Sequence, residues 1–472
     1  MKNIEDKLYP LLHAYKKSPQ LIKNIIGGLY STLPKKIMYG NTYLDFVRLI
    51  EQSKTFTKEE ILNYQWTEID KVLDIAFQTI PFYQKLYVEY GIKRFQIQNF
   101  DDFKNLPIIT KSDIKTNSES MVSSIYTNDK LKMNTGGSTG APLEFYIHKG
   151  ITRPKEQAFL NMFFSSLGYD RKIKSVTFRG DKINGNTLYM YDPIKNTYIF
   201  SSYRISSLTI NKIVESLNKI KPQFFFGYPS VIYELAQLIK LNADLRLNFN
   251  IKSIILASEK LFDFQISLIE SVFNSKVSTY YGHSERLTLA YKCATCDNYL
   301  VDPIYGYMEL VDTNNEIITD KNRTGRIIST GFNNAVMPLI RYETNDESCL
   351  TNEFCEHCNC EKYPLILNGI EGRTSDYIIG DDGRKISITA IIFGQHLTEF
   401  KKMSGFQLIQ YISGKVDFNI LGVNVLTFSE ESSLKEKLQN CSDKTIEFEI
   451  KYVNELIKTS TGKFKYLIQN IK

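Results

Sequence analysis

The sequence predicts an α/β protein, with a large N-terminal domain of βα sublobes around a mostly parallel sheet and a small C-terminal α+β domain. A length of 472 residues is too great for one simple core. Strand and helix patterns alternate through residues 251–281, which is typical of a βαβ unit. Beyond about Tyr377 hairpin and capping patterns replace this alternation. We therefore expect two domains, residues 1–376 and 377–472.

The N-terminal elements follow from apolar spacing and from prolines. Apolar residues recur at helical spacing over residues 66–90, so we expect an amphipathic helix that ends near Pro81. Residues 106–113 predict a turn that leads into another helix. After a glycine-rich loop, the alternating run 142–147 predicts a strand.

Further along the chain, residues 251–257 predict a buried strand and residues 277–281 predict the next one. Between them, one helix face is marked by Phe262, Ile266, Ile269 and Phe273. In the small domain, residues 406–423 predict a hairpin around Ser413-Gly414, and residues 445–453 alternate like a strand. Thr427 and Glu430 form a capping box for a helix through Leu438.

Composition and charge exclude several function classes. The hydrophobic content of 43% and the aromatic content of 13% are typical of a folded globular protein. The net charge of +6 is spread along the chain, with no block typical of a nucleic-acid arm or a membrane-binding stripe. No stretch approaches about 18 apolar residues, and the first residues lack a signal-peptide core. We therefore expect a cytoplasmic protein without nucleic-acid binding or membrane insertion, whose oligomeric state is left open.

A glycine-rich loop at residues 134–142, Asn-Thr-Gly-Gly-Ser-Thr-Gly-Ala-Pro, is the strongest chemical signal. Its backbone N–H groups and the hydroxyls of Ser138 and Thr139 are donors that suit a phosphate. The loop also matches the nucleophile elbow G-x-S-x-G, but an elbow opens into a helix, whereas a strand is expected after Pro142. It lacks the Walker lysine, and a plain glycine-rich hairpin turn is the remaining alternative.

Five segments resemble, in order, those of adenylate-forming enzymes. Residues 135–142 resemble the phosphate loop, residues 281–285 the Y-G-x-[ST]-E segment, and residues 337–346 the P-L-I-R-Y-x-T-x-D segment. Residues 372–376 resemble the G-R-[ST]-x-D hinge, and residues 461–463 the terminal lysine motif. Within this superfamily the chain is most similar to the phenylacetate-CoA ligase-like group and its capsular polysaccharide biosynthesis branch, through Leu106-Pro107-x-x-x-Lys111, Gly227-Tyr228-Pro229-Ser230 and residues 281–287.

The resemblance implies ATP-dependent activation of a small-molecule carboxylate to acyl-AMP, and then acyl transfer to a thiol or an amine, in surface or capsular polysaccharide biosynthesis. It implies an AMP-binding domain over residues 1–376 and a mobile domain over residues 377–472 that rotates about Asp376. ATP, AMP and Mg²⁺ are the implied cofactors, and CoA is a further candidate. The alternatives are an aryl-acid CoA ligase of the phenylacetate type and a catalytically inactive nucleotide-binding scaffold protein.

The resemblance also assigns roles to single residues. Lys463 would bridge the α-phosphate and the attacking carboxylate, Glu285 would hold magnesium, and Thr139 would join them in catalysis. Asp346 would accept hydrogen bonds from the ribose hydroxyls, and Arg373 would support the ribose side. Arg341 would support this region structurally. The other nucleotide-binding residues are Thr135, Gly136, Gly137, Ser138, Gly140, Ala257, Ser258, Glu259, Tyr281, Gly282 and Ser284.

Two departures and the acyl pocket leave open points. Ala141 stands where a lysine commonly follows the phosphate loop, which weakens the expected clamp on the γ-phosphate. Asn345 replaces the usual glycine before Asp346, which leaves the geometry of this turn open. The acyl pocket is expected to draw on residues near the motifs, although aromatic residues there are equally typical of plain core: Phe226, Tyr228, Pro229, Tyr280 and His283.

Seven cysteines, odd in number and clustered, favour metal ligation over a disulfide framework. Cys293-x-x-Cys296 has the spacing of zinc ligands. In some members of the resembled family a C-x-C pair twelve residues before the hinge binds zinc, and the interval from Cys360 to Gly372 matches. We predict a structural zinc on Cys293, Cys296, Cys358 and Cys360, with Cys355 in reserve. Buried thiols without a metal are the alternative.

Overall fold

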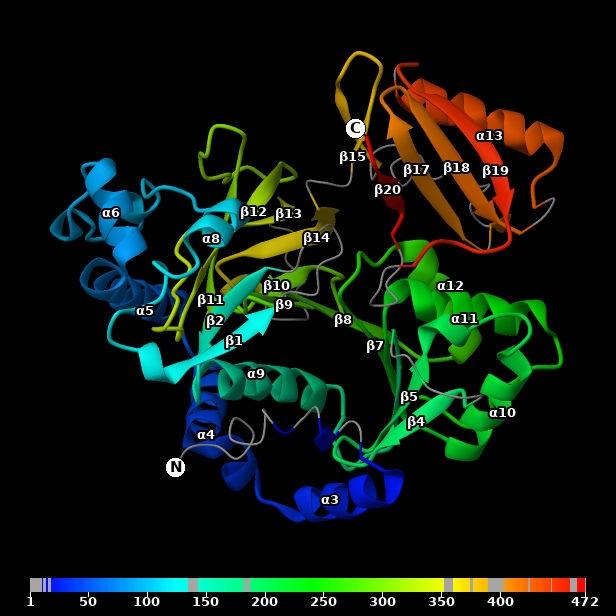
Figure 1. The fold of residues 1–472 in the computed structure, drawn as a ribbon, viewed down its shortest axis with the longest axis horizontal. Coiled ribbons are helices and arrows are strands. Elements are labelled where there is room, and N and C mark those ends of the chain that lie inside the picture. Colours follow the sequence, from blue (N-terminus) through cyan, green and yellow to red (C-terminus); the bar gives the residue numbers. More distant parts are fainter. Residues whose placement is uncertain are drawn as a thin grey trace. The chain divides into compact units, whose positions relative to one another are not determined.

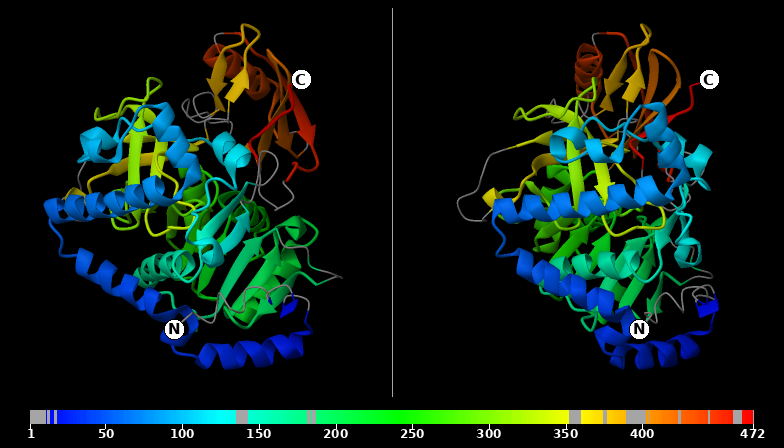
Figure 2. Two further views of the ribbon diagram at one scale, coloured as in Figure 1. Left: turned by 60° about the vertical axis from the view of Figure 1, so that its left-hand side comes forward. Right: turned by 90° about the vertical axis from the view of Figure 1, so that its left-hand side faces the viewer.

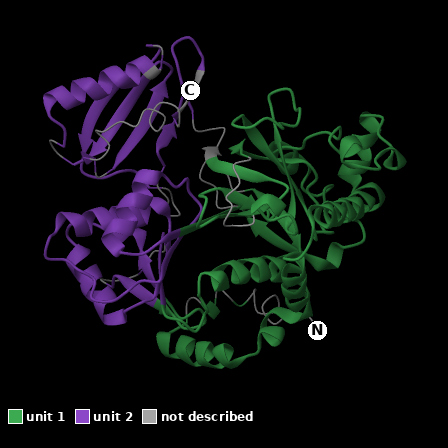
Figure 3. Ribbon diagram, turned by 180° about the vertical axis from the view of Figure 1, so that it is seen from behind, with its two compact units in different colours: residues 1–174, 191–197, 278–370 green, residues 175–190, 198–277, 371–472 purple. Residues whose placement is uncertain are grey.

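The computed structural model describes residues 11, 14–15, 18–134, 143–180, 183, 187–351, 360–373, 377–388, 402–403, 405–422, 425–442, 444–458 and 465–471. The chain forms two compact units (Figure 3). Unit 1 comprises residues 1–174, 191–197 and 278–370, and unit 2 comprises residues 175–190, 198–277 and 371–472. The predicted boundary at residue 376 stays a prediction.

Helices form the first part of unit 1 that the structure describes (Figure 1). Prolines stand at the start of several of them, namely Pro19, Pro34 and Pro81. The helix expected to end near Pro81 ends at Thr79, because Ile80 before Pro81 takes an extended conformation, and Pro81 then opens a second helix. The predicted turn before residue 111 ends in a capping box between Thr110 and Asp113. The helices are α3 Gln20–Thr32, α4 Lys35–Ser53, α5 Lys58–Thr79, α6 Pro81–Glu89, α7 Phe100–Phe103, α8 Lys111–Asn117 and α9 Thr152–Ser166, with short 3₁₀ turns η2 Arg94–Gln96 and η3 Thr127–Asp129.

The strands of unit 1 pair mainly antiparallel. A separate hairpin joins β1 to β2, so the glycine-rich loop opens a strand, as expected, and not a helix. β11 pairs with β12, β12 with β13, β10 with both β9 and β14, and β9 with β8. The strands are β1 Lys130–Asn134, β2 Glu144–His148, β8 Val277–Gly282, β9 Leu289–Lys292, β10 Tyr299–Val301, β11 Gly306–Val311, β12 Thr324–Gly331, β13 Tyr342–Leu350 and β14 Ile366–Arg373, with η5 Cys360–Lys362 before β14.

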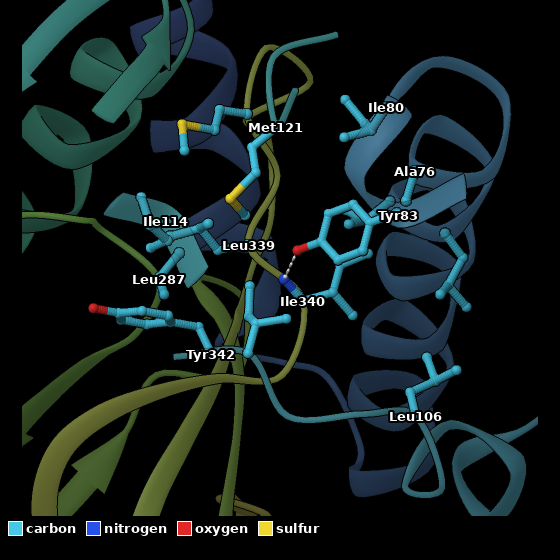
Figure 4. Close-up of a cluster of buried hydrophobic side chains, with 14 of the residues drawn as sticks. Ala76, Ile80, Tyr83, Leu106, Ile114, Met121, Leu287, Leu339, Ile340 and Tyr342 are labelled. Atoms are coloured by element: carbon cyan, nitrogen blue, oxygen red, sulfur yellow. Dashed lines mark hydrogen bonds between the residues drawn. The ribbon is translucent and has the colours of Figure 1, made fainter. Parts of the chain in front are cut away.

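The largest core of unit 1 packs α5 and α6 against the segment that leads into β13 (Figure 4). The buried Tyr83 hydroxyl accepts a hydrogen bond from the Ile340 backbone N–H at 2.9 Å and donates to the Pro338 carbonyl at 3.1 Å. Ile80 and Leu339 are buried in the same cluster. Because each such side chain contributes about 1.5–3 kcal/mol on burial, this core fixes the chain just before the 341–346 segment.

A buried lysine lies in a second core of unit 1, between α4 and α9. The Lys155 ammonium donates to the carbonyls of Tyr305 and Phe332 and lies 4.2 Å from the Tyr305 ring centroid. Burial lowers the pKa of Lys155 to about 7 and raises the pKa of Asp302 to about 6. Lys155 therefore joins the loop before β11 to the end of β12.

Unit 2 contains a parallel β-sheet with helices around it. β3 pairs parallel with β6, and β6 pairs parallel with β7. The connections α10 and α11 are helices, as parallel pairing requires, and their apolar faces share one core with these strands. The elements are β3 Ser175–Arg179, β4 Tyr189–Asp192, β5 Thr197–Ser201, η4 Ser202–Arg204, α10 Ile210–Ile220, β6 Phe224–Gly227, α11 Pro229–Leu241, β7 Ser253–Leu256 and α12 Asp263–Phe273.

The C-terminal part of unit 2 has its own core. A four-stranded sheet has the order β19-β18-β17-β20, and the predicted turn of its hairpin is confirmed by Gly414 at φ 78°. The predicted capping box between Thr427 and Glu430 opens α13. The elements are β15 Tyr377–Ile379, β16 Lys385–Ser387, β17 Phe406–Ile412, β18 Lys415–Leu421, α13 Phe428–Cys441, β19 Glu447–Val453 and β20 Leu467–Gln469.

The predicted α/β class is confirmed, but the expectation of a mostly parallel sheet is wrong in unit 1. Parallel pairing is found for β3, β6 and β7, where helices make the connections. In unit 1 the segments between β9 and β13 are too short for crossover helices, and short connections favour antiparallel neighbours.

Candidate active site

Two predicted acidic residues, Glu285 and Asp346, are each hydrogen-bonded by a tyrosine in unit 1. The Tyr281 hydroxyl, on β8, donates to Asp346 Oδ2 at 2.8 Å. The Tyr342 hydroxyl, at the start of β13, donates to Glu285 Oε1 at 3.3 Å. Burial, together with the charge of Asp346, raises the pKa of Tyr281 well above its ordinary value, so this phenol stays a donor. Both motif carboxylates are thus oriented before any ligand arrives.

The backbone at Asp346 has the conformation that the sequence left open. Asn345 lies at φ 61°, the left-handed region that glycine favours and asparagine tolerates. The Asp346 N–H donates to Thr344 Oγ1 at 3.2 Å, and this hydroxyl donates to the Ile327 carbonyl at 3.0 Å. The strand register also shifts here, since Arg326 faces Glu347 while Ile328 faces Glu343. Asp346 therefore lies on a bulge, a device that re-aims a side chain.

Arg341 supports this segment from inside unit 1. It is 2% exposed, and its Nε donates to Glu309 Oε2 at 3.0 Å. Its Nη1 donates to the carbonyls of Leu106, at 2.5 Å, and Lys104. Burial raises the pKa of Glu309, and the Arg341 guanidinium opposes that shift. The contacts match the structural role expected for Arg341, and they connect the 106–111 segment to β13.

The turn after β8 carries buried polar nitrogens. Arg286 N–H donates to the His283 carbonyl at 3.0 Å, and Arg286 lies at φ 59°. Both ring nitrogens of His283 and Nη1 of Arg286 are buried without a hydrogen-bond partner within the described part of the chain. An unpaired buried polar group costs about 1–3 kcal/mol. This turn therefore holds polar nitrogens without a partner among the described residues, and the place of His283 beside the substrate stays a prediction.

Tyr280, also predicted for the acyl pocket, contacts other aromatic residues in unit 1. Its ring lies 5.7 Å from the Phe163 ring and 6.0 Å from the Phe164 ring, both edge-on. Burial raises the pKa of Tyr280 to about 12. These contacts are those of a core residue, the alternative that the sequence left open.

In unit 2 the predicted adenine segment lies beside the predicted pocket segment. The Ala257 N–H donates to the Gly227 carbonyl at 3.3 Å, and the Ser230 N–H donates to Glu259 Oε2 at 3.1 Å. Ser258 lies at φ 73° between them. Glu259 thus caps the first turn of α11, where a negative charge is favourable.

Both segments follow the carboxyl ends of parallel strands, β6 and β7, where α/β proteins bind ligands. Tyr228 and Pro229 open α11 at this edge, and Phe226 lies in β6 itself.

The segments on either side of Lys463 are anchored within unit 2. Lys458 Nζ donates to Glu234 Oε2 at 2.8 Å and to the Ser202 carbonyl at 3.1 Å. The Tyr466 hydroxyl accepts from Gln265 Nε2 at 3.0 Å. Lys463 itself lies outside the described residues. Its neighbours on both sides thus contact α11, η4 and α12.

Several other predicted residues also lie outside the described part of the chain: Thr135, Gly136, Gly137, Ser138, Thr139, Gly140, Asp376, Cys355 and Cys358. Arg373 ends β14, and its side chain is likewise undescribed. For all of these the assigned roles stay predictions.

The predicted zinc ligands are described only in part. Cys293 and Cys296 lie in the turn between β9 and β10, and Cys360 begins η5 before β14. β10 pairs with both β9 and β14, so these distant segments belong to neighbouring strands. Among the described residues there is no group of three or more histidine, cysteine or acidic side chains that suits a metal. The zinc site stays a prediction.

Sequence reasoning missed the tyrosine that orients Glu285. Tyr342 stands inside the 337–346 segment, where only Arg341 and Asp346 were given roles. Sequence alone does not show that the hydroxyl at this position reaches Glu285 from another strand. The pairing of Ser230 with Glu259 was missed for the same reason, since it joins two turns that only the parallel sheet brings together.

Comparison with known proteins gives a consistent set of similarities. No family model matches the chain. The chain is 23% identical to protein CapK of Staphylococcus aureus, over 98% of this chain and all of that protein. It is 21% identical to a phenylacetate-coenzyme A ligase of Pseudomonas putida, over 80% of this chain and 85% of that enzyme.

Two solved structures have a similar fold. A 2-hydroxyisobutyryl-CoA ligase, crystallised in its postadenylation state with an acyl-AMP, matches with a TM-score of 0.65 and 17% identity, over 87% of this chain and 89% of that one. The acyl acid amido synthetase AtGH3.15 matches with a TM-score of 0.56 and 13% identity, over 89% and 90% of the two chains.

Proposed function

We propose that this chain, which belongs to the adenylate-forming superfamily in its phenylacetate-CoA ligase-like, CapK-like branch, activates a small-molecule carboxylate with ATP and passes the acyl group to a thiol or an amine. In the first step a carboxylate oxygen attacks the α-phosphorus of ATP. The bond between the α-phosphorus and the oxygen that bridges it to the β-phosphorus breaks, and pyrophosphate leaves. In the second step the acceptor attacks the acyl carbonyl, and AMP leaves.

The observation that carries the proposal is the pair of tyrosine-oriented acids in unit 1. Asp346, on its bulge and bonded by Tyr281, suits the two hydroxyls of a ribose, since a carboxylate accepts from both. Glu285, bonded by Tyr342, suits Mg²⁺, a hard cation that prefers oxygen ligands. Magnesium would neutralise charge on the triphosphate as it develops at phosphorus.

Lys463 would supply the positive charge at the reacting phosphate. Within unit 2, its neighbours Lys458 and Tyr466 contact α11 and α12, and the same unit holds the predicted adenine segment Ala257, Ser258 and Glu259. Rotation of residues 377–472 about Asp376 would exchange this arrangement for one suited to acyl transfer.

The finer assignments are also proposals. The acceptor is CoA, another thiol or an amine, since the similar structures include both CoA ligases and an amido synthetase. A role in surface or capsular polysaccharide biosynthesis follows the similarity to CapK. A structural zinc on the cysteines would stabilise the loop between β9 and β10 without entering the chemistry, because four thiolates leave no open position.

Carboxylate-dependent exchange of labelled pyrophosphate into ATP tests the first step, with panels of aryl, hydroxy and amino acids as substrates. The proposal expects exchange with at least one acid and its loss in E285Q. ATP binding without exchange for any acid would instead favour the inactive scaffold. Product analysis with CoA and with amines then separates the acceptors, and CoA thioester formation from an aryl acid would identify the aryl-CoA ligase.

A further inference from the structure

Helix α3 is built with its apolar side outward. Gly27 is buried, and a Cβ at that position would lie 2.5 Å from Pro193 Cβ, so this face packs tightly on the 191–197 segment of unit 1. At 3.6 residues per turn, the opposite arc holds five large apolar side chains. All five are exposed, with exposed fractions from 40% to 73%: Leu21, Ile22, Ile25, Ile26 and Leu29.

Polar contacts also connect α3 to the rest of unit 1. Gln20 Nε2 donates to the Tyr191 carbonyl at 3.1 Å, and Arg171 Nη2 donates to the Ser31 carbonyl at 3.1 Å. The Arg171 guanidinium also lies 5.6 Å from the Tyr30 ring. The helix is therefore inverted relative to an ordinary surface helix, which buries its apolar stripe. Figure 2 shows α3, in dark blue, at the periphery of unit 1.

The sequence on both sides of α3 carries charge of one sign. Between Asp6 and Asp45 the sequence has six lysines and no acidic residue. Lys35 and Lys36, at the start of α4, are exposed, as is the neighbouring Ile37. A cationic segment beside an apolar helix face is the combination that binds the surface of an anionic membrane.

We propose that α3 and the start of α4 attach this protein to the surface of an anionic phospholipid membrane. The attachment is peripheral. α3 has 13 residues, and no described helix is long and apolar enough to cross a bilayer. The helix would lie in the plane of the interface with its five apolar side chains among the lipids and the lysines at the phosphates. The sequence interpretation saw no membrane-binding stripe, because the outward direction of these apolar residues is visible only in the structure.

Vesicle co-sedimentation of the full chain tests the proposal. Vesicles of phosphatidylcholine alone are compared with an equal mixture of phosphatidylcholine and phosphatidylglycerol. We expect binding to the mixed vesicles, weaker binding to the neutral ones, and loss of binding as salt is raised. The variant L21Q/I25Q/L29Q should lose at least about tenfold in partitioning, since each buried leucine or isoleucine side chain contributes about 1.5–3 kcal/mol.

A matched control is V88Q/L208Q/L241Q, which removes three apolar side chains that are just as exposed but lie elsewhere. It should bind vesicles as the wild type does, and both triple variants should keep the wild-type circular dichroism. K35E/K36E should lower binding to the mixed vesicles only.

Three results would overturn the proposal. The first is a wild-type chain that stays in the supernatant with mixed vesicles. The second is equal binding to both vesicle types. The third is a dimer in analytical ultracentrifugation that L21Q/I25Q/L29Q converts to a monomer, since a second copy would then cover this face. Pyrophosphate exchange needs no vesicles, so the outcome is separate from the test of the proposed function.

Discussion

Removing the Tyr281 hydroxyl tests whether Asp346 is oriented for a nucleotide. The variant Y281F keeps the ring and its packing but loses the donor 2.8 Å from Asp346 Oδ2. A hydrogen bond to a charged group contributes about 1.5–3 kcal/mol, which corresponds to about 10- to 150-fold in an equilibrium constant. If Asp346 holds the ribose, the KM for ATP should rise within this range.

The effect should fall on KM more than on kcat, because the ribose contacts of Asp346 are the same in the ground state and the transition state. The assay is pyrophosphate exchange at varied ATP concentration. Y342F is the matched control, since it removes the hydroxyl that lies 3.3 Å from Glu285. It should raise the magnesium concentration needed for half-maximal exchange and leave the KM for ATP unchanged.

A double-variant cycle makes this reasoning refutable. D346N removes the charge of the proposed ribose acceptor and one of its two acceptor oxygens, so adding Y281F to D346N should have much less effect than Y281F alone. An unchanged KM for ATP in Y281F, or fully additive effects of Y281F and D346N, would show that the hydrogen bond does not act on the nucleotide.

Three further predictions concern the lysines and the cysteines. K463A should lower pyrophosphate exchange by about 10²–10³-fold, as for the loss of one preorganised donor, and its circular dichroism should be unchanged. A K463A variant that exchanges pyrophosphate at the wild-type rate would remove Lys463 from the mechanism. Purified protein should contain about one zinc per chain by elemental analysis, and C293S/C296S should lose it, whereas metal-free wild-type protein would contradict the site. Burial lowers the pKa of Lys155 to about 7, well below its ordinary value of about 10.4. Between these two pH values the unfolded state binds more protons than the folded state, so the free energy of unfolding rises with pH there. In K155M that rise, about 1.4 kcal/mol per pH unit at most, should disappear in denaturant titrations, and an unchanged slope would place the titrating group elsewhere.

Local rules predicted much of the fold. The capping box of Thr427 and Glu430, the proline at residue 81 and the alternation of the small domain depend on residues a few positions apart, and these predictions agree with the structure. Strand direction in unit 1 was predicted wrongly, because periodicity shows that a segment is a strand but not which neighbour it pairs with. The length of the connections was the missed signal.

The motif residues were found because each motif is contiguous, whereas the contacts that orient them are not. Asn345 illustrates the difference. Sequence shows a departure from glycine, and the structure shows that asparagine takes the same left-handed conformation at φ 61°. The pairing of Tyr281 with Asp346 depends on which strand ends meet, which sequence patterns do not fix.

The segment around Lys463 combines both situations. Its motif is readable from sequence, but the contacts that hold the segment are not. Lys458 contacts Glu234 and Tyr466 contacts Gln265, and both partners lie on helices more than a hundred residues earlier in the sequence. If residues 377–472 rotate between two half-reactions, these anchors belong to one state and must break in the other. The side chains of Lys458 and Glu234 are 19% and 25% exposed, and separating such a pair leaves both charges in need of solvent. The cost of that separation would set part of the balance between acid activation and acyl transfer, so the contact between Lys458 and Glu234 would help to regulate the exchange between the two states.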